Sequence, residues 1–188
     1  GKTTFARELC RRTGLPYYEM DGFFHGPGWE PIPTFVDDVA EVVAREEWVF
    51  DSHGYADVRD LMWSRVDTVV WLDFARHVVT SRVTRRSFVR AWDKQPLYNG
   101  NTEQFRRWIE PDHPIQWSVR AYNARREDML TRFADRQYAG VRKVHLRAPR
   151  AAARCRWCPC HASRCLPAHG ERSLPLPSAS RAQARPRS

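Results

Sequence analysis

The run of residues 68–74, Thr-Val-Val-Trp-Leu-Asp-Phe, constrains the fold of this chain more than any other stretch. Its residues are almost all β-branched or apolar, which is typical of a strand covered on both faces of a parallel sheet. Hydrophobic periodicity predicts further strands at residues 17–20, 48–50 and 140–146, and helices at residues 2–12, 34–43, 57–65, 75–92 and 114–135. Because strands and helices alternate, the sequence predicts an α/β fold with a parallel sheet flanked by helices.

Acidic residues stand at the ends of three predicted strands. Asp21 follows residues 17–20, Asp51 follows residues 48–50, and Asp73 lies at the end of the longest run. Ligands of parallel α/β sheets bind at the carboxyl ends of the strands, so these are the first positions to consider for a function. Aspartate is also common in turns and caps, and we interpret Asp73 as such a strand-end residue.

The first four residues, Gly1-Lys2-Thr3-Thr4, match the second half of a phosphate-binding loop, G-x-x-x-x-G-K-[ST], that opens into a helix. Backbone N–H groups and the dipole at a helix start attract an anion, and a glycine lets the phosphates approach closely. In that interpretation Lys2 reaches the β- and γ-phosphates, Thr3 binds Mg²⁺, and Thr4 touches the α-phosphate. A solvated helix start is the alternative. A complete loop has a buried strand and another glycine upstream, so we expect both to precede Gly1.

Four arginines share one face of the helix predicted at residues 75–92. They occur at i, i+3, i+4 and i+8, and they are Arg82, Arg85, Arg86 and Arg90. An exposed face of arginines is usually solvated surface. Here it leads into a polar, irregular segment at residues 93–110, with a turn at Asn99-Gly100-Asn101.

Charge and composition divide the chain near residue 150. Of the formal net charge of +9, +3 falls within residues 1–150 and +6 within residues 151–188. The larger part is therefore only mildly basic, and its charge is not an argument for nucleic-acid binding. No apolar run is long enough for a membrane span. Cys10 is the one cysteine of residues 1–150, which suits a reducing cytoplasm.

Residues 151–188 are rich in Arg, Pro, Ala, Ser and Cys and have no periodic pattern. Short spacings between Cys155, Cys158, Cys160 and His161 suit thiolate and imidazole ligands of zinc, although they match no ordinary zinc ribbon. A basic interaction tail is a second interpretation. We prefer a third, in which the segment is disordered or translated out of frame after the domain of residues 1–150.

With these residues placed, residues 1–150 resemble the adenylate-kinase-like P-loop proteins, and more closely the bacterial group called topology-modulation proteins. The matching stretches are Gly1-Lys2-Thr3-Thr4, Glu19-Met20-Asp21, Pro27-Gly28-Trp29, residues 48–55, residues 68–73, the four arginines and Tyr98-Asn99-Gly100-Asn101. The turn Asp51-Ser52-His53-Gly54-Tyr55 is one residue longer than the group's Asp-Gly-Asn-Tyr. The resemblance implies a three-layer P-loop NTPase whose first, central strand is missing from this sequence.

The resemblance also implies roles for individual residues. Asp51 would be a Walker-B-like carboxylate near the Mg²⁺ ion bound by Thr3, and Asp21 would face the acceptor pocket. The arginines would belong to a lid, in which Arg82 and Arg86 stabilise the transferring phosphoryl group while Arg85 and Arg90 bind nucleotide phosphates. Arg106 and Arg107 are the next candidates at the far end of the lid.

The sequence therefore predicts a cytoplasmic phosphotransferase that moves a phosphoryl group from Mg-ATP to a small acceptor, or an ATPase. The alternative is a nucleotide-binding regulatory protein, or one associated with nucleic acid, without kinase activity. Nucleic acid is the less favoured partner, and no membrane partner is expected. Without its central strand the chain is expected to be aggregated or molten and to bind ATP poorly, because several buried backbone groups would lack partners.

Overall fold

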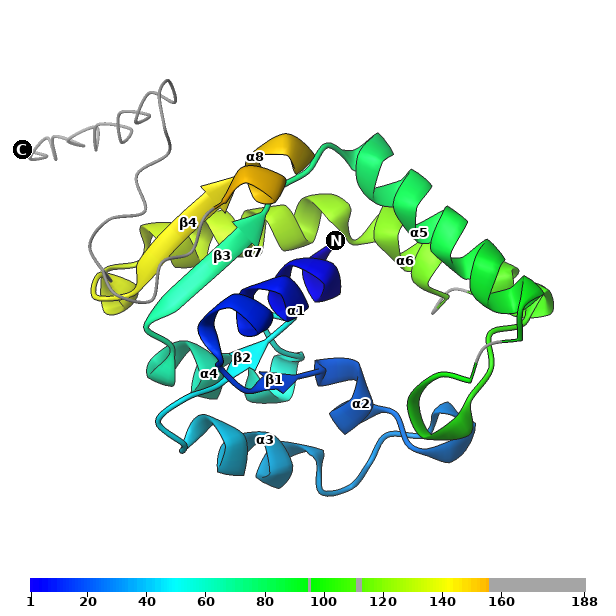
Figure 1. Ribbon diagram of the computed structural model, residues 1–188, viewed down its shortest axis with the longest axis horizontal. Coiled ribbons are helices and arrows are strands. Elements are labelled where there is room, and N and C mark those ends of the chain that lie inside the picture. Colours follow the sequence, from blue (N-terminus) through cyan, green and yellow to red (C-terminus); the bar gives the residue numbers. More distant parts are fainter. Residues whose placement is uncertain (95, 111–112, 156–188) are drawn as a thin grey trace, which may run out of the picture.

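The computed structural model describes residues 1–94, 96–110 and 113–155 (Figure 1). The elements are, in chain order, α1 (Lys2–Thr13), β1 (Tyr17–Tyr18), α2 (Met20–Phe24), η1 (Pro27–Trp29), α3 (Phe35–Val43), β2 (Val49–Phe50), α4 (Ala56–Arg65), β3 (Thr68–Leu72), α5 (Arg76–Trp92), η2 (Tyr98–Gly100), η3 (Phe105–Ile109), α6 (Pro114–Arg120), α7 (Tyr122–Ala134), η4 (Arg136–Tyr138), β4 (Arg142–Leu146) and α8 (Pro149–Arg154). Helices and parallel strands are mixed, as the predicted α/β class requires. Residues 156–188, which include the Cys and His side chains considered as zinc ligands after Cys155, lie outside the described residues, so none of the three interpretations of the tail is tested.

The strands form two parallel pairs. β1 pairs with β2 from Tyr17 opposite Val49, and β3 pairs with β4 from Thr68 opposite Arg142 to Leu72 opposite Leu146. Within the described residues, no backbone ladder joins one pair to the other. The predicted parallel pairing is confirmed, whereas a single continuous sheet is not formed by the strands described.

The environment of β3 differs from the prediction. Its sequence predicts burial on both faces, but all five of its residues are half-buried, and so are the residues of the other three strands. Among the residues that the structure describes, β3 has one strand partner, β4. An edge without a neighbouring strand leaves side chains and backbone of the adjacent apolar run open to solvent.

Two element boundaries also differ from the prediction. Residues 17–20 were expected to be one strand, but the strand ends at Tyr18, and Met20 begins α2 with its side chain fully buried. The long helix expected at residues 114–135 is two helices, α6 and α7, which meet at Ala121. Its apolar periodicity continues through that junction, so the sequence pattern does not reveal the break.

The hydrophobic core has two parts. The larger part joins α2, α3 and α4 through the buried side chains of Met20, Phe35, Val39, Val43, Val58 and Met62. The smaller part joins α4, α7 and η4 through Trp63, Met129 and Tyr138. Val42 of α3 is buried as well, whereas Val36 is 43% exposed. Both clusters are built from helices that flank the strands.

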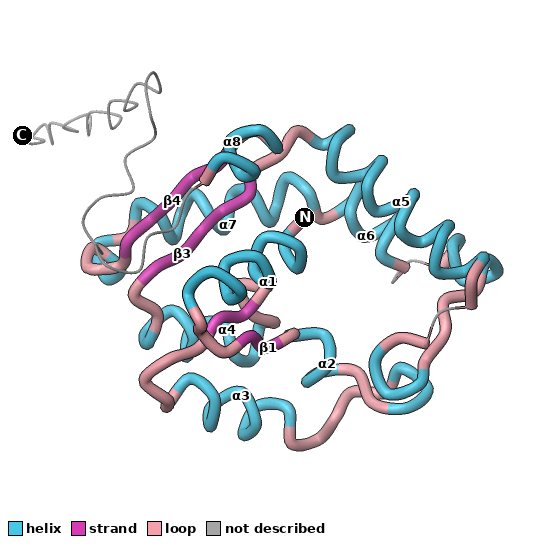
Figure 2. Tube along the Cα trace, viewed as in Figure 1, coloured by secondary structure: helices cyan, strands magenta, loops and turns pink. Residues whose placement is uncertain are grey.

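The elements are arranged around α1. In Figure 1, β3 and β4 lie with α7 and α8 on one side of α1, while β1, β2 and α2 to α4 lie on the other. Helices α5 and α6 pack against each other and extend away from both strand pairs (Figure 2). The start of α1 therefore lies in the middle of the molecule. No helix among the described residues is both long and apolar enough to cross a membrane.

The Asp73 side chain, just after β3, links this strand to β4 and α7 through hydrogen bonds and ion pairs. Its carboxylate, 7% exposed, accepts hydrogen bonds from Nε of Arg126 on α7 at 3.1 Å and is 2.9 Å from Nε2 of His145 on β4. The imidazole of His145 stacks on the indole of Trp71, with ring centres 4.2 Å apart. These contacts support the interpretation of Asp73 as a structural residue at a strand end.

Candidate functional site

Gly1 precedes the first turn of α1 in crowded surroundings. A β-carbon at Gly1 would lie 3.3 Å from Nη1 of Arg82 and 3.5 Å from Cε2 of Phe74. A side chain at this position would therefore displace its neighbours. No side chain caps the start of α1, so the free N–H groups of the first turn keep their capacity to bind an anion.

Thr3 and Asp51 meet at the head of α1. The Thr3 hydroxyl donates a hydrogen bond of 2.6 Å to Oδ2 of Asp51, the residue that directly follows β2. The phenol of Tyr17 donates to the same oxygen at 3.0 Å, and the backbone N–H of Met20 donates to Oδ1 at 3.3 Å. Both carboxylate oxygens are therefore held in place. Two residues that the sequence assigns to one metal site, 48 positions apart, are in direct contact.

The turn after β2 requires the glycine that it contains. Gly54 has φ +90°, and a β-carbon there would lie 2.9 Å from Sδ of Met62 and 3.0 Å from Cα of Arg59. This left-handed conformation is favourable only for glycine, and no room exists for a side chain. The turn thus packs tightly against α4, which fixes the backbone on the carboxyl side of Asp51.

Asp21 lies in α2 and is held by two phenols. The hydroxyl of Tyr55 donates to Oδ1 at 3.0 Å, and that of Tyr98 lies 3.4 Å from Oδ2. Burial raises the pKa of Tyr55, and the negative charge of Asp21 raises it further, so this phenol stays protonated and remains a donor. Asp21 itself is exposed to solvent.

Several cations surround the head of α1. Lys2 as a whole is exposed to solvent, yet the protein around its ammonium lowers its pKa by desolvation, and the charge of Arg125 lowers it further. The pKa of Arg125 is also lowered, first by burial and then by Arg59. Among the described residues no carboxylate forms an ion pair with Arg125, whose guanidinium lies 4.1 Å from the ring centre of Trp117. Positive charge is therefore incompletely compensated at this point.

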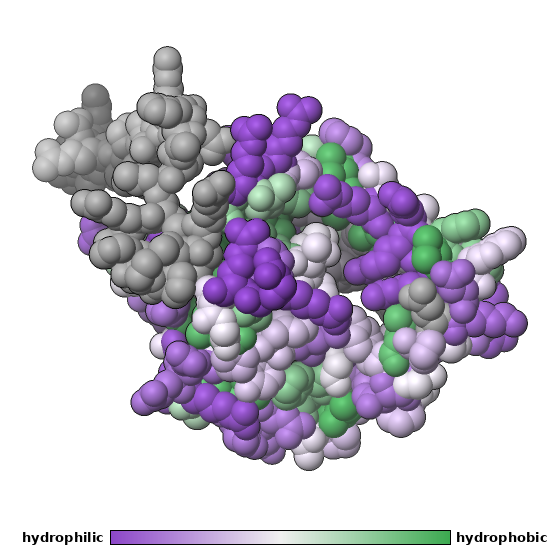
Figure 3. All heavy atoms as spheres, viewed as in Figure 1, coloured by the Kyte–Doolittle hydropathy of each residue, from purple (hydrophilic) through white to green (hydrophobic). Residues whose placement is uncertain are grey.

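Two of the α5 arginines act on the head of α1. Arg82 approaches Gly1 and lies over the Phe74 ring, and the charge of Arg86 acts on Lys2. Arg82, Arg85 and Arg86 are exposed to solvent, and Arg90 is half-buried. All four line one open hollow of about 300 Å³, and within the described residues none of them is ion-paired. In the space-filling view, strongly hydrophilic surface alternates with hydrophobic surface over α5 (Figure 3).

Thr4 and Arg107 are two further candidates from the sequence, and neither forms a hydrogen bond with Asp51 within the described residues. Thr4 lines a cleft of about 460 Å³ between α1, β3 and α8, together with Leu9, Leu72 and Phe74. Arg107 is paired with Glu110 at 2.7 Å and lies over the ring of Trp29. The structure therefore brings Lys2, Thr3 and Asp51 together with Arg82 and Arg86, while the remaining candidates surround this group.

Arg125 is the site residue that sequence reasoning missed. It lies one position before Arg126 in a stretch of α7 that contains several charged residues, and nothing in the local pattern distinguishes the two. Arg126 pairs with Asp73, whereas the guanidinium of Arg125 acts on the ammonium of Lys2. What distinguishes Arg125 as a site residue is that no carboxylate among the described residues pairs with it. This depends on tertiary structure, so the sequence does not show it.

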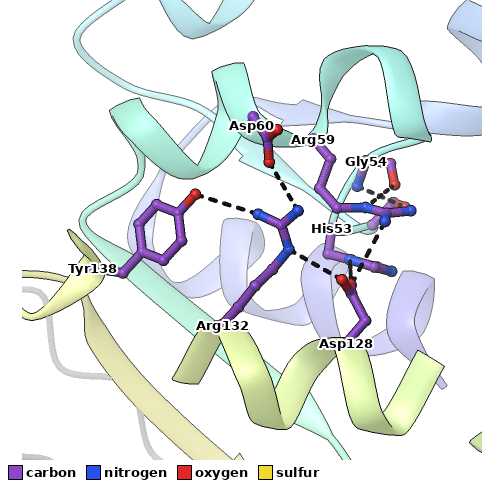
Figure 4. A network of polar contacts seen from close by, with 8 residues as sticks. His53, Gly54, Arg59, Asp60, Asp128, Arg132 and Tyr138 are labelled. Carbon is purple, nitrogen blue, oxygen red and sulfur yellow. Dashed lines mark hydrogen bonds and ion pairs between the residues drawn. The ribbon is translucent and has the colours of Figure 1, made fainter. Parts of the chain in front are cut away.

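A polar network braces α7 against α4 and the turn after β2 (Figure 4). Arg132 binds Asp60 at 2.8 Å and Asp128 at 3.3 Å, and Oδ2 of Asp128 is 3.6 Å from Arg59 and 3.8 Å from Nδ1 of His53. His53 is largely buried, and its Nδ1 has no hydrogen-bond partner. Burial and the charge of Arg125 lower the pKa of His53 to about 3, so its ring is neutral.

The chain matches no protein-family model, no curated protein and no solved structure.

Adjacent arginines on α7 are expected to differ in their contribution to stability. Replacing Arg126 with methionine leaves the buried Asp73 carboxylate with His145 as its remaining side-chain partner. That change should cost about 2 kcal/mol and lower Tm by about 4–8 °C. Replacing Arg125 with methionine keeps the packing on Trp117 and removes an uncompensated cation, so Tm should stay equal or rise. Thermal unfolding of the two variants checks this, and equal losses would contradict the charge assignment.

His53 is expected to make stability depend on pH. Its pKa is about 3 in the folded chain and near 6.5 when unfolded, so between these values the unfolded state binds the extra proton. Stability contributed by neutral His53 is therefore complete above pH 6.5 and is lost as pH falls towards 3, with a slope that approaches about 1.4 kcal/mol per pH unit. Denaturant unfolding of wild type and His53→Gln from pH 7.5 to 4 should give a shallower dependence for the variant. Parallel curves would disprove the assignment.

Proposed function

We propose that this chain binds ATP with Mg²⁺ and transfers the terminal phosphoryl group to a small acceptor, in the manner of the adenylate-kinase-like proteins that it resembles. The observation that carries the proposal is the 2.6 Å contact between the Thr3 hydroxyl and the Asp51 carboxylate at the head of α1. A hydroxyl directly after Gly-Lys, beside a carboxylate at a strand end, is the pair that a nucleotide-bound Mg²⁺ uses in P-loop proteins. Lys2 adjoins this pair in the chain.

The proposal includes the P-loop fold, with one strand between β2 and β3. The start of α1 contacts residues at the carboxyl ends of both strands. Thr3 donates a hydrogen bond to Asp51, which follows β2. Gly1 lies next to Leu72, the last residue of β3, and to Phe74 just after it. A strand that leads into Gly1 would therefore run between them and parallel to both. Such a strand would pair with the free edges and bury the half-exposed side chains of β2 and β3.

The charges around the head of α1 support a polyanionic ligand. Lys2, Arg82, Arg86 and Arg125 gather there, and within the described residues none of the four forms an ion pair. Like charges brought this close repel one another unless an anion lies between them. The triphosphate of a nucleotide supplies that charge, and arginine binds phosphate oxygens through two parallel hydrogen bonds.

Thr3 and Asp51 fit a magnesium site of the kind found with nucleotides. Mg²⁺ at such sites is held by one or two protein oxygens, and phosphate oxygens and water complete the octahedron. The described residues contain no group of three or more His, Cys, Asp or Glu side chains placed to hold a metal. A site with one hydroxyl and one carboxylate agrees with that. When bound, the ion would neutralise charge on the transferring phosphoryl group.

Asp21 is suited to hold the acceptor. Its carboxylate would accept a hydrogen bond from the acceptor hydroxyl and take up the proton as the oxygen attacks the γ-phosphorus. The bond between the γ-phosphorus and the bridging oxygen then breaks, and ADP leaves with that electron pair. Arg82 and Arg86 would stabilise the negative charge on the transferring group, because they approach Gly1 and Lys2 from α5.

A second candidate function is supported by the outer face of α5. Phe88 and Trp92 are 49% and 71% exposed and stack on each other beside the arginines. Exposed aromatic rings next to arginines suit single-stranded nucleic acid, whose bases stack and whose phosphates bind cations. The two functions separate experimentally, because nucleic-acid binding falls steeply with salt, whereas a kinase forms ADP when an acceptor is added.

Lys2→Ala is the variant that tests the proposed function. In a chain extended upstream of Gly1 by a strand and the glycine-rich half of the loop, ATP turnover should fall at least about 10²-fold without loss of fold. A panel of nucleosides, nucleotides and small alcohols with an ADP readout identifies the acceptor. The control is Arg65→Ala at the exposed end of α4, which should keep wild-type turnover. Near-normal ATP turnover in Lys2→Ala would contradict the kinase interpretation.

A further inference from the structure

The motif Tyr98-Asn99-Gly100-Asn101 has no part in the function proposed above, but the structure gives it definite contacts. Its first three residues form η2, in the segment that follows α5, and η2 packs against both α2 and η1. The motif therefore meets the chain immediately after Asp21. Segments more than 70 positions apart in the sequence are joined there.

Asn101 makes the central contacts of this junction. Its side chain is buried, its Oδ1 accepts a hydrogen bond from the backbone N–H of Trp29 at 3.2 Å, and its Nδ2 donates to the carbonyl oxygens of Gly26 and Tyr98, each at 2.8 Å. Asn99 adds a bond of 2.6 Å from Nδ2 to the carbonyl oxygen of His25. Both amide ends of Asn101 are therefore used, and a buried amide with satisfied partners fixes one arrangement of the two segments.

Tyr98 extends the junction to the carboxylates. Its hydroxyl lies 3.2 Å from Oε1 of Glu19 and 3.4 Å from Oδ2 of Asp21. A phenol carries one proton, so it donates to one of these oxygens at a time. Burial, and next the charge of Asp21, raise the pKa of Tyr98, which keeps that proton in place. Its ring packs where Gly22 has no side chain, 3.7 Å from the position a β-carbon would take.

The backbone on both sides of the junction is held in uncommon conformations. Trp29 has φ +68° and Asn99 has φ +53°. Asparagine tolerates the left-handed conformation better than most residues, whereas for a bulky residue such as tryptophan it is unfavourable and persists where surrounding contacts impose it. The contact at Trp29 comes from Asn101, whose side chain accepts a hydrogen bond from the Trp29 backbone N–H. Asn99 is held by its own side chain, which donates to the carbonyl oxygen of His25.

The segment is also anchored at its other end. His113 accepts a hydrogen bond at Nδ1 from the backbone N–H of Ile115, so its proton is on Nε2, which lies 3.1 Å from Oε1 of the buried Glu103. This pair ties the chain after the motif to the start of α6, and α6 packs against α5. The motif is thus connected through the helix pair to the arginines.

We propose that residues 98–101 are a latch that holds the α5 and α6 helix pair against the segment after Asp21, and so sets the position of Asp21 relative to the α5 arginines. Tyr98 and Asn101 are positioning residues for the acceptor carboxylate. The catalytic meaning of the latch rests on the function proposed above. The mechanical part does not rest on that function. It states that the backbone amides of the two distant segments exchange their hydrogens with solvent as one cooperative unit.

Hydrogen–deuterium exchange of the full chain tests the mechanical part. Asn101→Ala removes three hydrogen bonds, so amides of residues 25–31 should exchange about tenfold faster or more, together with those of residues 97–102. Asn101→Asp keeps size and the acceptor for Trp29 but places an oxygen against two carbonyl oxygens, and it should have a similar effect. Asn123→Ala on the exposed face of α7 is the matched control. Peptides from β3 and β4 report whether each variant stays folded.

Unchanged exchange of residues 25–31 in folded Asn101→Ala would overturn the proposal, and faster exchange of both segments supports it. Turnover provides a separate measurement, with the nucleosides and nucleotides of the acceptor panel as probes. Asn101→Ala should raise KM for the acceptor at least about fivefold and leave KM for ATP within about twofold, because the latch contacts Asp21 and not the head of α1. Equal effects on both constants would contradict the role at Asp21. Turnover is measured in the chain extended upstream of Gly1. If that extended wild type transfers to no probe, the proposed function fails, and the exchange data alone decide whether the latch exists.

Discussion

The contact between Asp51 and Thr3 is the interaction on which the arrangement of this protein depends. Asp51 receives hydrogen bonds from the start of α1, from β1 and from the start of α2 while it is itself attached to β2. Four elements are therefore positioned by one carboxylate. The three donors hold both carboxylate oxygens of Asp51 in place beside the cations near the head of α1. The same residue can thus order the fold and supply one ligand to a cation.

Ion pairs along α7 offset the repulsion between Arg125 on this helix and the other cations near Asp51. Arg125 brings a half-buried positive charge towards Lys2, which is unfavourable without an anion. The neighbouring residue Arg126 is bound to Asp73, and one turn or more further along Arg132 is bound to Asp60 and Asp128. These ion pairs, both formed by residues that follow Arg125 in α7, keep the helix in place in spite of the repulsion. Sites that bind anions commonly hold such unfavourable charges, because the ligand relieves the repulsion on binding.

Local sequence signals predicted much of the fold and fewer of the site's details. The end of α1 follows from Gly14, which takes the left-handed conformation that stops a helix, and the strand at residues 68–72 follows from its β-branched run. Both depend on neighbours in the chain. The half-burial of β3, the break at Ala121 and the position of Arg125 depend on what packs against each element. Periodicity carries no information about that, so the sequence could not reveal them.

Magnesium dependence of ATP binding tests the central claim most directly. In the chain extended upstream of Gly1, the dissociation constant of ATP is measured by titration calorimetry with and without Mg²⁺ for wild type, Thr3→Val and Asp51→Asn. The account predicts that Mg²⁺ tightens ATP binding by wild type at least about tenfold and has little effect on either variant, because both side chains hold the same ion. The same response to Mg²⁺ in all three proteins would show that Thr3 and Asp51 do not form a nucleotide-bound magnesium site.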